Sequence, residues 1–298
     1  MPRRSFAAPH RLDLRATLGP LSTRRGDPTH RLAPDEAWRA TRTPHGPAAL
    51  HLRLRSGRVE AEAWGPGADW ALDGAPALVG MDDAPEELRT EHDLVRRLQH
   101  RHPGLRLCRS RAVTEILVPT ILAQKVTGLE ARRAWHRLVR LHGEPAPGDS
   151  GLRVPPSAAT LAALPYYDFH RLGVERRRAD TVRRVCAWAV RVEEVVDMPL
   201  PDAYRRLMAF PGVGIWTAAN VARVALGDPD AVEVGDYHVP NTVAWNLAGE
   251  ARADDARMLE LLEPFRGQRG RVVRLLEIGA PRAPSFGPRQ PIRRVELL

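Results

Sequence analysis

One carboxylate stands where an irregular segment changes into a helical pattern. Asp236 follows Gly235, and Pro240 lies near the start of the pattern that comes next, as is typical of a helix N-terminus. Asp is favoured at helix N-caps, so Asp236 taken alone indicates a cap more readily than a catalyst. A rigidly held carboxylate can also stabilise developing positive charge, and it can orient or deprotonate water. The two roles are compatible, and the neighbouring Asp230 and Glu233 are assigned no catalytic role.

A glycine-rich turn precedes this carboxylate. Residues 201–226 contain two helical patterns on either side of 210–214, which read FPGVG. Pro211 ends the first helix, and the two glycines permit a tight turn. The second helix opens at Ile215 with exposed backbone N–H groups, which can bind a phosphate without any side-chain charge. An ordinary turn between two core helices is the alternative, but the complete string favours phosphate binding.

Residues 90–280 resemble the helix–hairpin–helix DNA glycosylases, and within them the 3-methyladenine DNA glycosylase II or AlkA type. The hairpin at 210–214 matches the family's hairpin, and Asp236, 22 residues beyond Gly214, stands where the family keeps its catalytic Asp. The resemblance implies a DNA N-glycosylase of base excision repair. Such an enzyme flips out alkylated purines of the 3-methyladenine type and removes them hydrolytically, leaving an abasic site. It also implies a monomer whose partner is double-stranded DNA containing a damaged base, with no obligate protein partner.

The chemistry of base release explains why such a site needs a carboxylate. Departure of the base builds positive charge on the deoxyribose, which Asp236 would stabilise. An alkylated purine is already cationic, so its departure requires little help from an acid. Relatives that also cleave the strand carry a lysine nucleophile two residues after the last hairpin glycine, and here that position is Trp216. The resemblance therefore implies a monofunctional enzyme, because Schiff-base chemistry needs an amine and Lys125 is the sole lysine.

Aromatic residues occupy two positions that match the family's base pocket. Trp216 and Tyr237 can attract a cationic base through cation–π contacts worth about 0.5–2 kcal/mol. Both are also compatible with ordinary core packing. Two other positions depart from the family, because Asn220 and Gly279 stand where the AlkA type has aromatic residues. We therefore expect a base pocket of Trp216, Tyr237 and Asn220 that is more open or more polar, and the substrate range is not carried over.

Residues 121–127 resemble the family segment that fills the gap left by the flipped base. That wedge is usually apolar because it replaces base stacking, whereas here the position after Gln124 is Lys125. Lys125 can plug the gap or hold a phosphate, and a solvated lysine at a helix end is the alternative. The resemblance implies the following DNA-binding residues: Gln124, Lys125, Thr127, Pro211, Gly212, Val213, Gly214, Ile215 and Thr217.

The family also binds a monovalent cation through carbonyl oxygens of its hairpin. The matching backbone carbonyls are those of Met208, Phe210 and Val213, so we expect a structural Na⁺ or K⁺ there. No cofactor is expected for the chemistry. The two cysteines, Cys108 and Cys186, exclude an iron–sulfur cluster held by four cysteines.

The composition agrees with a polyanionic partner. Lys plus Arg number 45 against 36 Asp plus Glu, which gives a net charge of +9. Because nearly all the basic residues are arginine, a bias in base composition is the alternative explanation. No stretch reaches the roughly 20 apolar residues that span a bilayer, and the N-terminus has no apolar run of signal-peptide length. We expect a soluble, cytoplasmic protein that associates with the nucleoid and has no membrane partner.

The positioning elements change character along the chain. Residues 48–64 alternate apolar and polar side chains around Ser56-Gly57, which predicts a β-hairpin, and 12–19 and 37–43 are further strand candidates. From about residue 84 the periodicity is helical, with a capping box from Thr127 to Glu130. Helices are predicted over about 110–125, 127–141, 175–195, 201–209, 215–226, 238–248, 254–263 and 270–278.

The expected fold is α+β and mainly α, with a small N-terminal antiparallel β-sheet domain followed by a helical core. We assign residues 1–85 to the β-rich domain and 86–280 to a helical glycosylase domain, whose two lobes enclose the active-site cleft. Residues 281–298 are expected to form an irregular tail rich in Pro and Arg. A non-catalytic helix–hairpin–helix protein that binds DNA or senses lesions is the alternative function. A glycosylase for oxidised or deaminated bases is a third reading.

Overall fold

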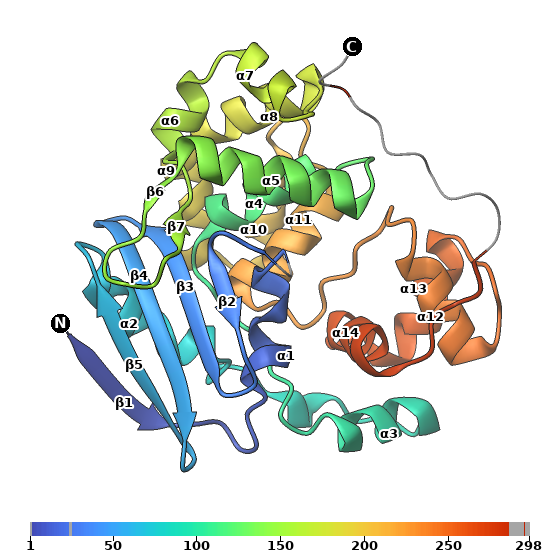
Figure 1. Ribbon diagram of the computed structural model, residues 1–298. Coiled ribbons are helices and arrows are strands. Elements are labelled where there is room, and N and C mark those ends of the chain that lie inside the picture. Colours follow the sequence, from blue (N-terminus) through green and yellow to red (C-terminus); the bar gives the residue numbers. More distant parts are fainter. Residues whose placement is uncertain (1, 24–25, 286–294, 296–298) are drawn as a thin grey trace.

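The N-terminal part of the chain forms a twisted antiparallel sheet. The computed structural model describes residues 2–23, 26–285 and 295. The sheet has five strands in the order β1-β5-β4-β3-β2, visible in blue in Figure 1. The strands are β1 (Arg3–Ala7), β2 (His30–Leu32), β3 (Glu36–Thr43), β4 (Gly46–Arg55) and β5 (Arg58–Trp64). The predicted antiparallel sheet is confirmed.

The hairpin between β4 and β5 is closed by a two-residue turn. Ser56 has φ 48° and Gly57 has φ 72°, and Arg55 pairs with Arg58 across them. Two consecutive residues with positive φ match the right-handed twist of the flanking strands, which explains the Ser-Gly sequence. The strand predicted at 12–19 is wrong, because residues Leu14–Leu18 form helix α1. The Asp13 carboxylate caps α1 by accepting a hydrogen bond from Ala16 N at 2.8 Å.

Helices dominate the rest of the described chain, which also holds a two-stranded sheet of β6 (Glu144–Pro145) and β7 (Arg153–Val154). Helix α2 (Ala68–Leu78) packs on the sheet through β4 and β5. The capping box at Thr127 and Glu130 is present at the start of α5. The helix predicted at 175–195 is interrupted at Trp188, where α8 ends and α9 begins. The central group is α4 (Val113–Leu122), α5 (Gly128–His142), α6 (Ala158–Ala163), α7 (Tyr166–Arg171), α8 (Arg176–Ala187), α9 (Ala189–Glu193), α10 (Leu200–Met208) and α11 (Ile215–Val221).

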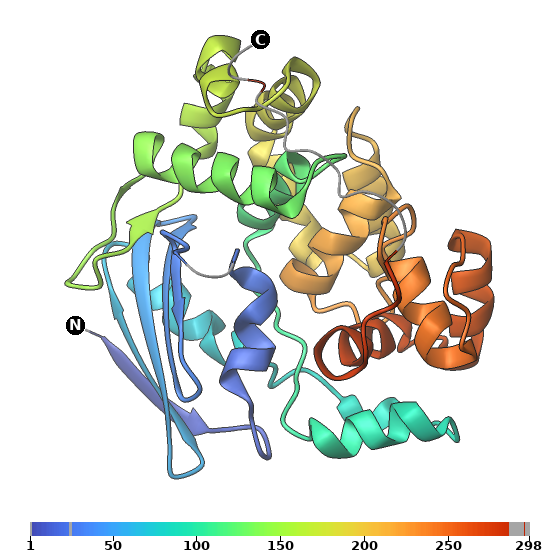
Figure 2. The ribbon, with the colours of Figure 1, turned by 45° about the vertical axis from the view of Figure 1, so that its right-hand side comes forward.

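A second group of helices lies apart from the sheet, on the right in Figure 1. It consists of α3 (Asp93–Arg101), α12 (Val239–Ala248), α13 (Asp255–Leu262) and α14 (Arg269–Gly279). Helix α3 precedes the central group in sequence but packs on α14, so the chain leaves this group and returns to it (Figure 2).

Two hydrophobic clusters follow this division. The larger cluster runs from the inner face of the sheet through α4, α5, α8, α10 and α11, with Phe169 and Leu207 among its fully buried side chains. The smaller cluster is formed by α3, α12, α13 and α14 and contains Met258. The predicted tail at 281–298 falls largely outside the described residues. The fold class is confirmed, whereas the boundaries at 85 and 280 stay predictions.

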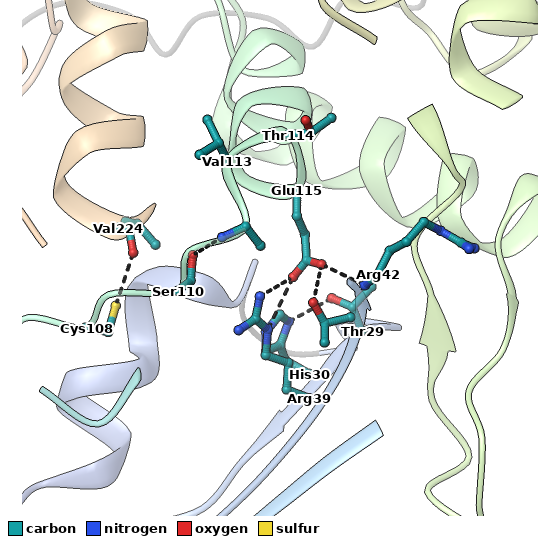
Figure 3. A network of polar contacts seen from close by, with 12 residues as sticks. Thr29, His30, Arg39, Arg42, Cys108, Ser110, Val113, Thr114, Glu115 and Val224 are labelled. Atoms are coloured by element: carbon teal, nitrogen blue, oxygen red, sulfur yellow. Dashed lines mark hydrogen bonds and ion pairs between the residues drawn. The ribbon is translucent and has the colours of Figure 1, made fainter. Parts of the chain in front are cut away.

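A buried ion pair joins the sheet to the central helices (Figure 3). Glu115 on α4 accepts a hydrogen bond from Arg39 Nη2 on β3 at 2.8 Å, and each side chain is only 7% exposed. Its other oxygen accepts hydrogen bonds from the Thr41 hydroxyl at 2.6 Å and from Arg42 N at 3.2 Å. The carboxylate is therefore satisfied on both sides, and it fixes α4 against the sheet.

Removing this carboxylate is expected to destabilise the fold strongly. Glu115→Ala leaves the buried Arg39 guanidinium without its partner, which costs about 3–5 kcal/mol in the free energy of unfolding. Glu144→Ala is the matched control, since Glu144 pairs with Arg42 near the surface and is 47% exposed, and it should cost less than about 1 kcal/mol. Urea denaturation followed by circular dichroism measures both, and equal midpoints for the two variants would contradict the argument.

Candidate active site

Asp236 lies at the start of α12, where backbone amides hold its carboxylate. Its Oδ1 accepts hydrogen bonds from His238 N at 2.7 Å and from Val239 N at 3.0 Å. The loop before it is fixed by Asp255 on α13, which accepts the Gly235 N–H at 3.0 Å. Gly235 has φ +91°, a conformation that favours glycine. The N-cap of α12 is His238 rather than Asp236, so the cap indicated by the sequence is wrong by two residues. The Asp236 carboxylate instead holds two backbone N–H groups at the entrance of the helix with Oδ1, which leaves its second oxygen, Oδ2, for another partner.

That second oxygen contacts the helix of the hairpin. Trp216 Nε1 on α11 donates a hydrogen bond to Asp236 Oδ2 at 3.0 Å. The indole and the carboxylate are 20 residues apart in sequence and come from different helix groups. Three N–H donors thus fix the orientation of one half-buried carboxylate, and the structure brings Trp216 and Asp236 together as one unit.

An open cleft adjoins this unit. Its walls come from α1 and the segment leading to β2 on one side, and from the Asp236 loop, α12 and α14 on the other. Among the described residues, six arginines line the cleft: Arg15, Arg31, Arg223, Arg252, Arg274 and Arg282. The carboxylates that line it are Asp236, Asp254, Asp255 and Glu277. The excess of arginine suits a polyanion.

A row of side chains with alternating charges connects to the Asp236 loop. Arg223 Nη1 lies 2.9 Å from Glu233 Oε1 and 3.4 Å from Glu277 Oε2, and Arg274 Nη1 lies 3.3 Å from the same Glu277 oxygen. Arg274 also donates a hydrogen bond to Ala16 O on α1. The chain of charges therefore connects the end of the hairpin helix, the loop before Asp236, α14 and the N-terminal domain.

Glu233 is the most buried member of this set, with 3% of its surface exposed. Burial raises the pKa of its carboxyl group, and Arg223 opposes that shift. Asp236 acts in the same direction as burial, because a second negative charge disfavours the ionised form of Glu233. The carboxyl groups of Glu233 and Asp236 therefore interact electrostatically. Arg223 forms an ion pair with Glu233.

The hairpin adopts the predicted form between α10 and α11. Gly212 has φ +95°, and a Cβ there would lie 2.4 Å from Thr181 Oγ1, so glycine is required on both counts. Val213 N donates to Phe210 O at 2.9 Å and closes the turn. Arg184 Nη1 donates to Pro211 O at 2.8 Å, and Gln124 Nε2 donates to Gly212 O at 2.9 Å. Side chains from outside the hairpin thus hold its peptide groups in place.

The wedge segment forms the turn between α4 and α5. Lys125 is exposed and has φ 55°, and Gln124 turns its amide toward the hairpin. The Thr127 hydroxyl is occupied by Glu130 in the capping box. Thr217 is 2% exposed, and its hydroxyl receives the second Gln124 hydrogen bond at 2.9 Å. Within this turn, Lys125 is therefore the side chain left exposed to a ligand.

Comparison with curated proteins finds relatives that match part of the chain. No family model matches the chain. It is 33% identical over 167 residues to a probable bifunctional transcriptional activator/DNA repair enzyme AlkA of Mycobacterium tuberculosis, covering 53% of this chain and 33% of that protein. It is 27% identical over 146 residues to a putative DNA-3-methyladenine glycosylase, YfjP, of Bacillus subtilis, covering 48% of this chain and 50% of that protein. The matches thus span a third to a half of these relatives.

Solved structures agree over almost the whole chain. A 3-methyladenine DNA-glycosylase from Archaeoglobus fulgidus superposes with a TM-score of 0.78 at 19% identity, covering 93% of this chain and 98% of that one. The chain has the fold of the helix–hairpin–helix DNA glycosylases. A Clostridium acetobutylicum 8-oxoguanine glycosylase/lyase bound to double-stranded DNA also matches, with a TM-score of 0.61 at 14% identity over 83% of this chain and 96% of that one.

Within this glycosylase fold, the departures noted in the sequence have structural causes. A Cβ on Gly279 would lie 2.5 Å from His102 Nε2 and 2.7 Å from Leu98 Cδ2, so the end of α14 packs directly on α3 and its C-terminal continuation. An aromatic side chain has no room there. The Asn220 amide donates to Trp216 O at 2.8 Å, which leaves it bound to its own helix. Tyr237 lines the cleft but is 81% exposed.

Arg223 and Glu277 are cleft residues of this glycosylase fold that the sequence reasoning missed. Arg223 lies seven residues after Trp216, a spacing that predicts one face of a helix, and the structure places it in the π-helical segment Ala222–Leu226 that continues α11. That spacing was available in the sequence. Glu233 also gave a signal, since a lone carboxylate within the apolar string AVEV predicts a buried ion pair. Glu277 gave none, because its contact with Arg223 depends on how α14 packs.

The indole donor predicts a testable effect on chemistry. Trp216→Phe keeps an aromatic ring but removes the indole N–H that orients Asp236. A hydrogen bond to a charged group contributes about 1.5–3 kcal/mol. We expect base release to slow by about 10- to 100-fold under single-turnover conditions. Trp188→Phe, at an exposed position between α8 and α9, is the matched control and should leave the rate unchanged. A Trp216→Phe rate equal to wild type would remove Trp216 from the site.

Proposed function

We propose that this chain is a monofunctional DNA N-glycosylase of base excision repair that removes alkylated purines from duplex DNA and leaves an abasic site. The observation that carries the proposal is the Asp236 carboxylate, held by three N–H donors beside an arginine-rich cleft on a glycosylase fold. The names of the curated relatives, an AlkA and a 3-methyladenine glycosylase, support the choice of alkylated purine.

The chemistry follows from the fixed carboxylate. The bond between C1′ of the deoxyribose and the base nitrogen breaks, and its electron pair leaves with the base. Asp236 stabilises the positive charge that remains on the sugar. A water molecule then attacks C1′, and Asp236 accepts its proton. The indole of Trp216 keeps Oδ2 in place during these steps, because its hydrogen bond restricts rotation of the carboxylate.

The base would be held beside this carboxylate by Trp216, Tyr237 and Asn220. Tyr237 follows Asp236 directly, and its exposed ring is free to contact a base that has left the duplex. Gly279 supplies no wall to this pocket, because the space beside it is filled by His102 and Leu98.

The hairpin would hold the DNA backbone. Gly212, Gly214 and Ile215 would present backbone N–H groups at the start of α11, where a phosphate is favoured. Pro211 has no N–H and the Val213 N–H is used inside the turn, so these two would contribute through the shape of the turn. Of the remaining DNA-contact candidates, Lys125 would enter the duplex. Gln124 and Thr217 would support the hairpin from the side away from the DNA, and Thr127 would support the Lys125 turn by capping α5. Chromosomal DNA in the nucleoid is then the site of action.

A monovalent cation would complete the hairpin. In the described part of the chain, the carbonyls of Pro211 and Gly212 accept hydrogen bonds from side chains, whereas no hydrogen bond to Met208 O or Val213 O occurs. Phe210 O accepts one from Val213 N and keeps a second lone pair. Carbonyl oxygens are suitable ligands for Na⁺ or K⁺, so Met208, Phe210 and Val213 fit the expected site. The cation would hold a phosphate and would take no part in base release.

A panel of lesion duplexes tests the proposed function. Oligonucleotides carrying 3-methyladenine, 7-methylguanine, hypoxanthine or 1-methyladenine are incubated with the protein, and alkali then reveals abasic sites. We expect cleavage after alkali for the alkylated purines and none without alkali. Release of hypoxanthine alone would indicate a glycosylase for deaminated bases. Duplex binding without release of any base would establish the non-catalytic DNA-binding or lesion-sensing alternative.

Borohydride trapping tests the monofunctional claim. Trp216 stands where a lyase nucleophile would be, so no Schiff base should form with an abasic duplex. We expect no covalent protein–DNA band on a denaturing gel. A trapped band that disappears in Lys125→Arg would show that the sole lysine acts as a nucleophile.

A further inference from the structure

We propose that Gln124, together with Arg178, Thr181 and Arg184 of α8, forms a brace that couples the Lys125 turn to the hairpin. In this proposal, which rests on the proposed function, these four are positioning residues. A phosphate held at the hairpin thereby sets where Lys125 meets the duplex. The four residues are called the brace below.

Gln124 makes the direct link. Its amide Nε2 donates to Gly212 O and to Thr217 Oγ1, each at 2.9 Å. One acceptor belongs to the hairpin turn and the other to the first turn of α11. A single amide group therefore binds both the turn and the helix that follows it. An amide NH₂ has two donors, and both are used here. Gln124 therefore acts as a tie between the two segments.

Helix α8 supports both segments from behind. Arg178, Thr181 and Arg184 are spaced three residues apart, so they lie along one face of the helix. Arg178 Nη1 donates to Leu122 O at the end of α4 at 2.7 Å. Arg184 Nη1 donates to Pro211 O in the hairpin at 2.8 Å. Between them, Thr181 lies where a Cβ on Gly212 would be, which makes this a close backbone contact.

The contacts form a closed loop. It runs from α8 to Leu122, along two residues to Gln124, across to Gly212, and back to α8 through Thr181. A closed loop of hydrogen bonds and close packing restricts relative movement more than any single bond, because each contact limits the freedom of the next.

Lys125 stands at the end of this loop with an unusual backbone. Its φ of 55° places it in the left-handed region, which a residue with a side chain rarely adopts without support from its surroundings. Gln124, the residue before it, is held by the hairpin, and Arg178 holds Leu122, three residues before it at the end of α4. The brace thus fixes the direction in which the exposed lysine leaves the protein.

A double-mutant cycle tests the coupling on DNA. Gln124→Ala, Lys125→Ala and the double variant are compared by the ratio of dissociation constants for an undamaged duplex and a duplex with a tetrahydrofuran abasic analogue. If Gln124 acts by positioning Lys125, each single change should lower this preference by about tenfold, and the double variant by no more than the larger of the two. A hundredfold loss in the double variant, the product of the two effects, would overturn the proposal.

A matched control separates the brace from general loss of an amide. Gln99 on α3 also donates to a backbone carbonyl, Leu88 O, at 2.9 Å, but it lies in the other helix group. Gln99→Ala should leave the lesion preference unchanged. An equal loss in the Gln99 and Gln124 variants would contradict a local role.

Amide hydrogen exchange of the free protein tests the brace without DNA. Gln124→Ala should speed exchange in two separate segments, 121–127 and 209–217, whereas Gln99→Ala should change neither. Unchanged exchange in 209–217 would overturn the brace whether or not the protein binds DNA. Faster exchange in both segments together with no DNA binding would retain the brace and reject the proposed function.

Discussion

Asp236→Asn is expected to slow base release by about 100- to 1,000-fold, which is the range for loss of one preorganised electrostatic group. Asparagine has the same shape and retains an oxygen that can accept the amides of His238 and Val239, so the turn before α12 can persist. Its NH₂ group then faces Trp216 Nε1, so asparagine loses that hydrogen bond. It has lost the negative charge that would stabilise the sugar cation, and it cannot accept a proton from water. The effect should therefore fall on the chemical step alone.

The measurement is single-turnover release with enzyme in excess over a 7-methylguanine duplex. Binding to the same duplex, followed by fluorescence anisotropy, should remain within about twofold, because a change confined to the transition state leaves the dissociation constant unaltered. Asp255→Asn is a useful comparison, since Asp255 holds Gly235 at a distance from the reacting atoms. It should slow release less than Asp236→Asn does. Comparable rates for Asp236→Asn and wild type would assign the chemistry elsewhere.

Gly212→Ala is expected to disrupt the hairpin and, with it, binding to every duplex. The new Cβ would lie 2.4 Å from Thr181 Oγ1, and the residue would keep φ +95°. The left-handed conformation costs about 1–2 kcal/mol for a residue with a side chain. Overpacking adds about 1–3 kcal/mol. We expect a loss of about 2–5 kcal/mol in the free energy of unfolding, and at least a tenfold weaker affinity for undamaged and damaged DNA alike.

Two variants make this second prediction specific. Gly214→Ala adds the same methyl group where nothing lies within 4 Å, so stability should stay close to wild type. Thr181→Ala combined with Gly212→Ala removes the atoms that clash and should restore part of the lost stability. Urea denaturation reports the stability and anisotropy the affinity. A destabilised Gly214→Ala with a stable Gly212→Ala would contradict the packing seen at the hairpin.

The hairpin and its carboxylate could be predicted because their constraints are local. Gly212 needs a positive φ whatever surrounds it, and Pro211 ends α10 for covalent reasons. Asp236 carried the signature of a helix start, and its carboxylate does bind backbone N–H groups there, although the N-cap of α12 is His238, two residues further on. The hairpin of β4 and β5 was predicted for the same kind of reason, since its two-residue turn and alternating pattern are both local.

Other features depend on contacts between distant segments. Residues 12–19 alternate as a strand would, yet Asp13 caps a short helix whose leucines Leu14 and Leu18 are buried against the sheet. The helix predicted at 175–195 is interrupted at Trp188, which the periodicity did not show. The hydrogen bond from Trp216 to Asp236 and the pairing of Arg223 with Glu277 require two helix groups to meet. No pattern within one segment specifies such a meeting.

Helix packing also explains why a pocket position differs from the AlkA type. Gly279 is glycine because α3 lies against it, so the aromatic wall of the AlkA type is replaced by a helix–helix contact. Beside the Asp236 loop, the cleft instead carries Arg223, Arg274 and Glu277. Because these charged side chains lie next to the carboxylate that we propose as catalytic, we expect lesion preference to be the property that differs most from the named relatives.

Mass spectrometry of the small molecules released from methylated duplex DNA tests the central claim most directly. Wild-type protein should release free 3-methyladenine or 7-methylguanine, and the DNA strands should stay intact until alkali is added. Asp236→Asn should bind the same DNA and release neither base above the spontaneous rate. Wild-type protein that binds this DNA but yields no free base beyond the spontaneous rate would contradict the assignment of this chain as a glycosylase.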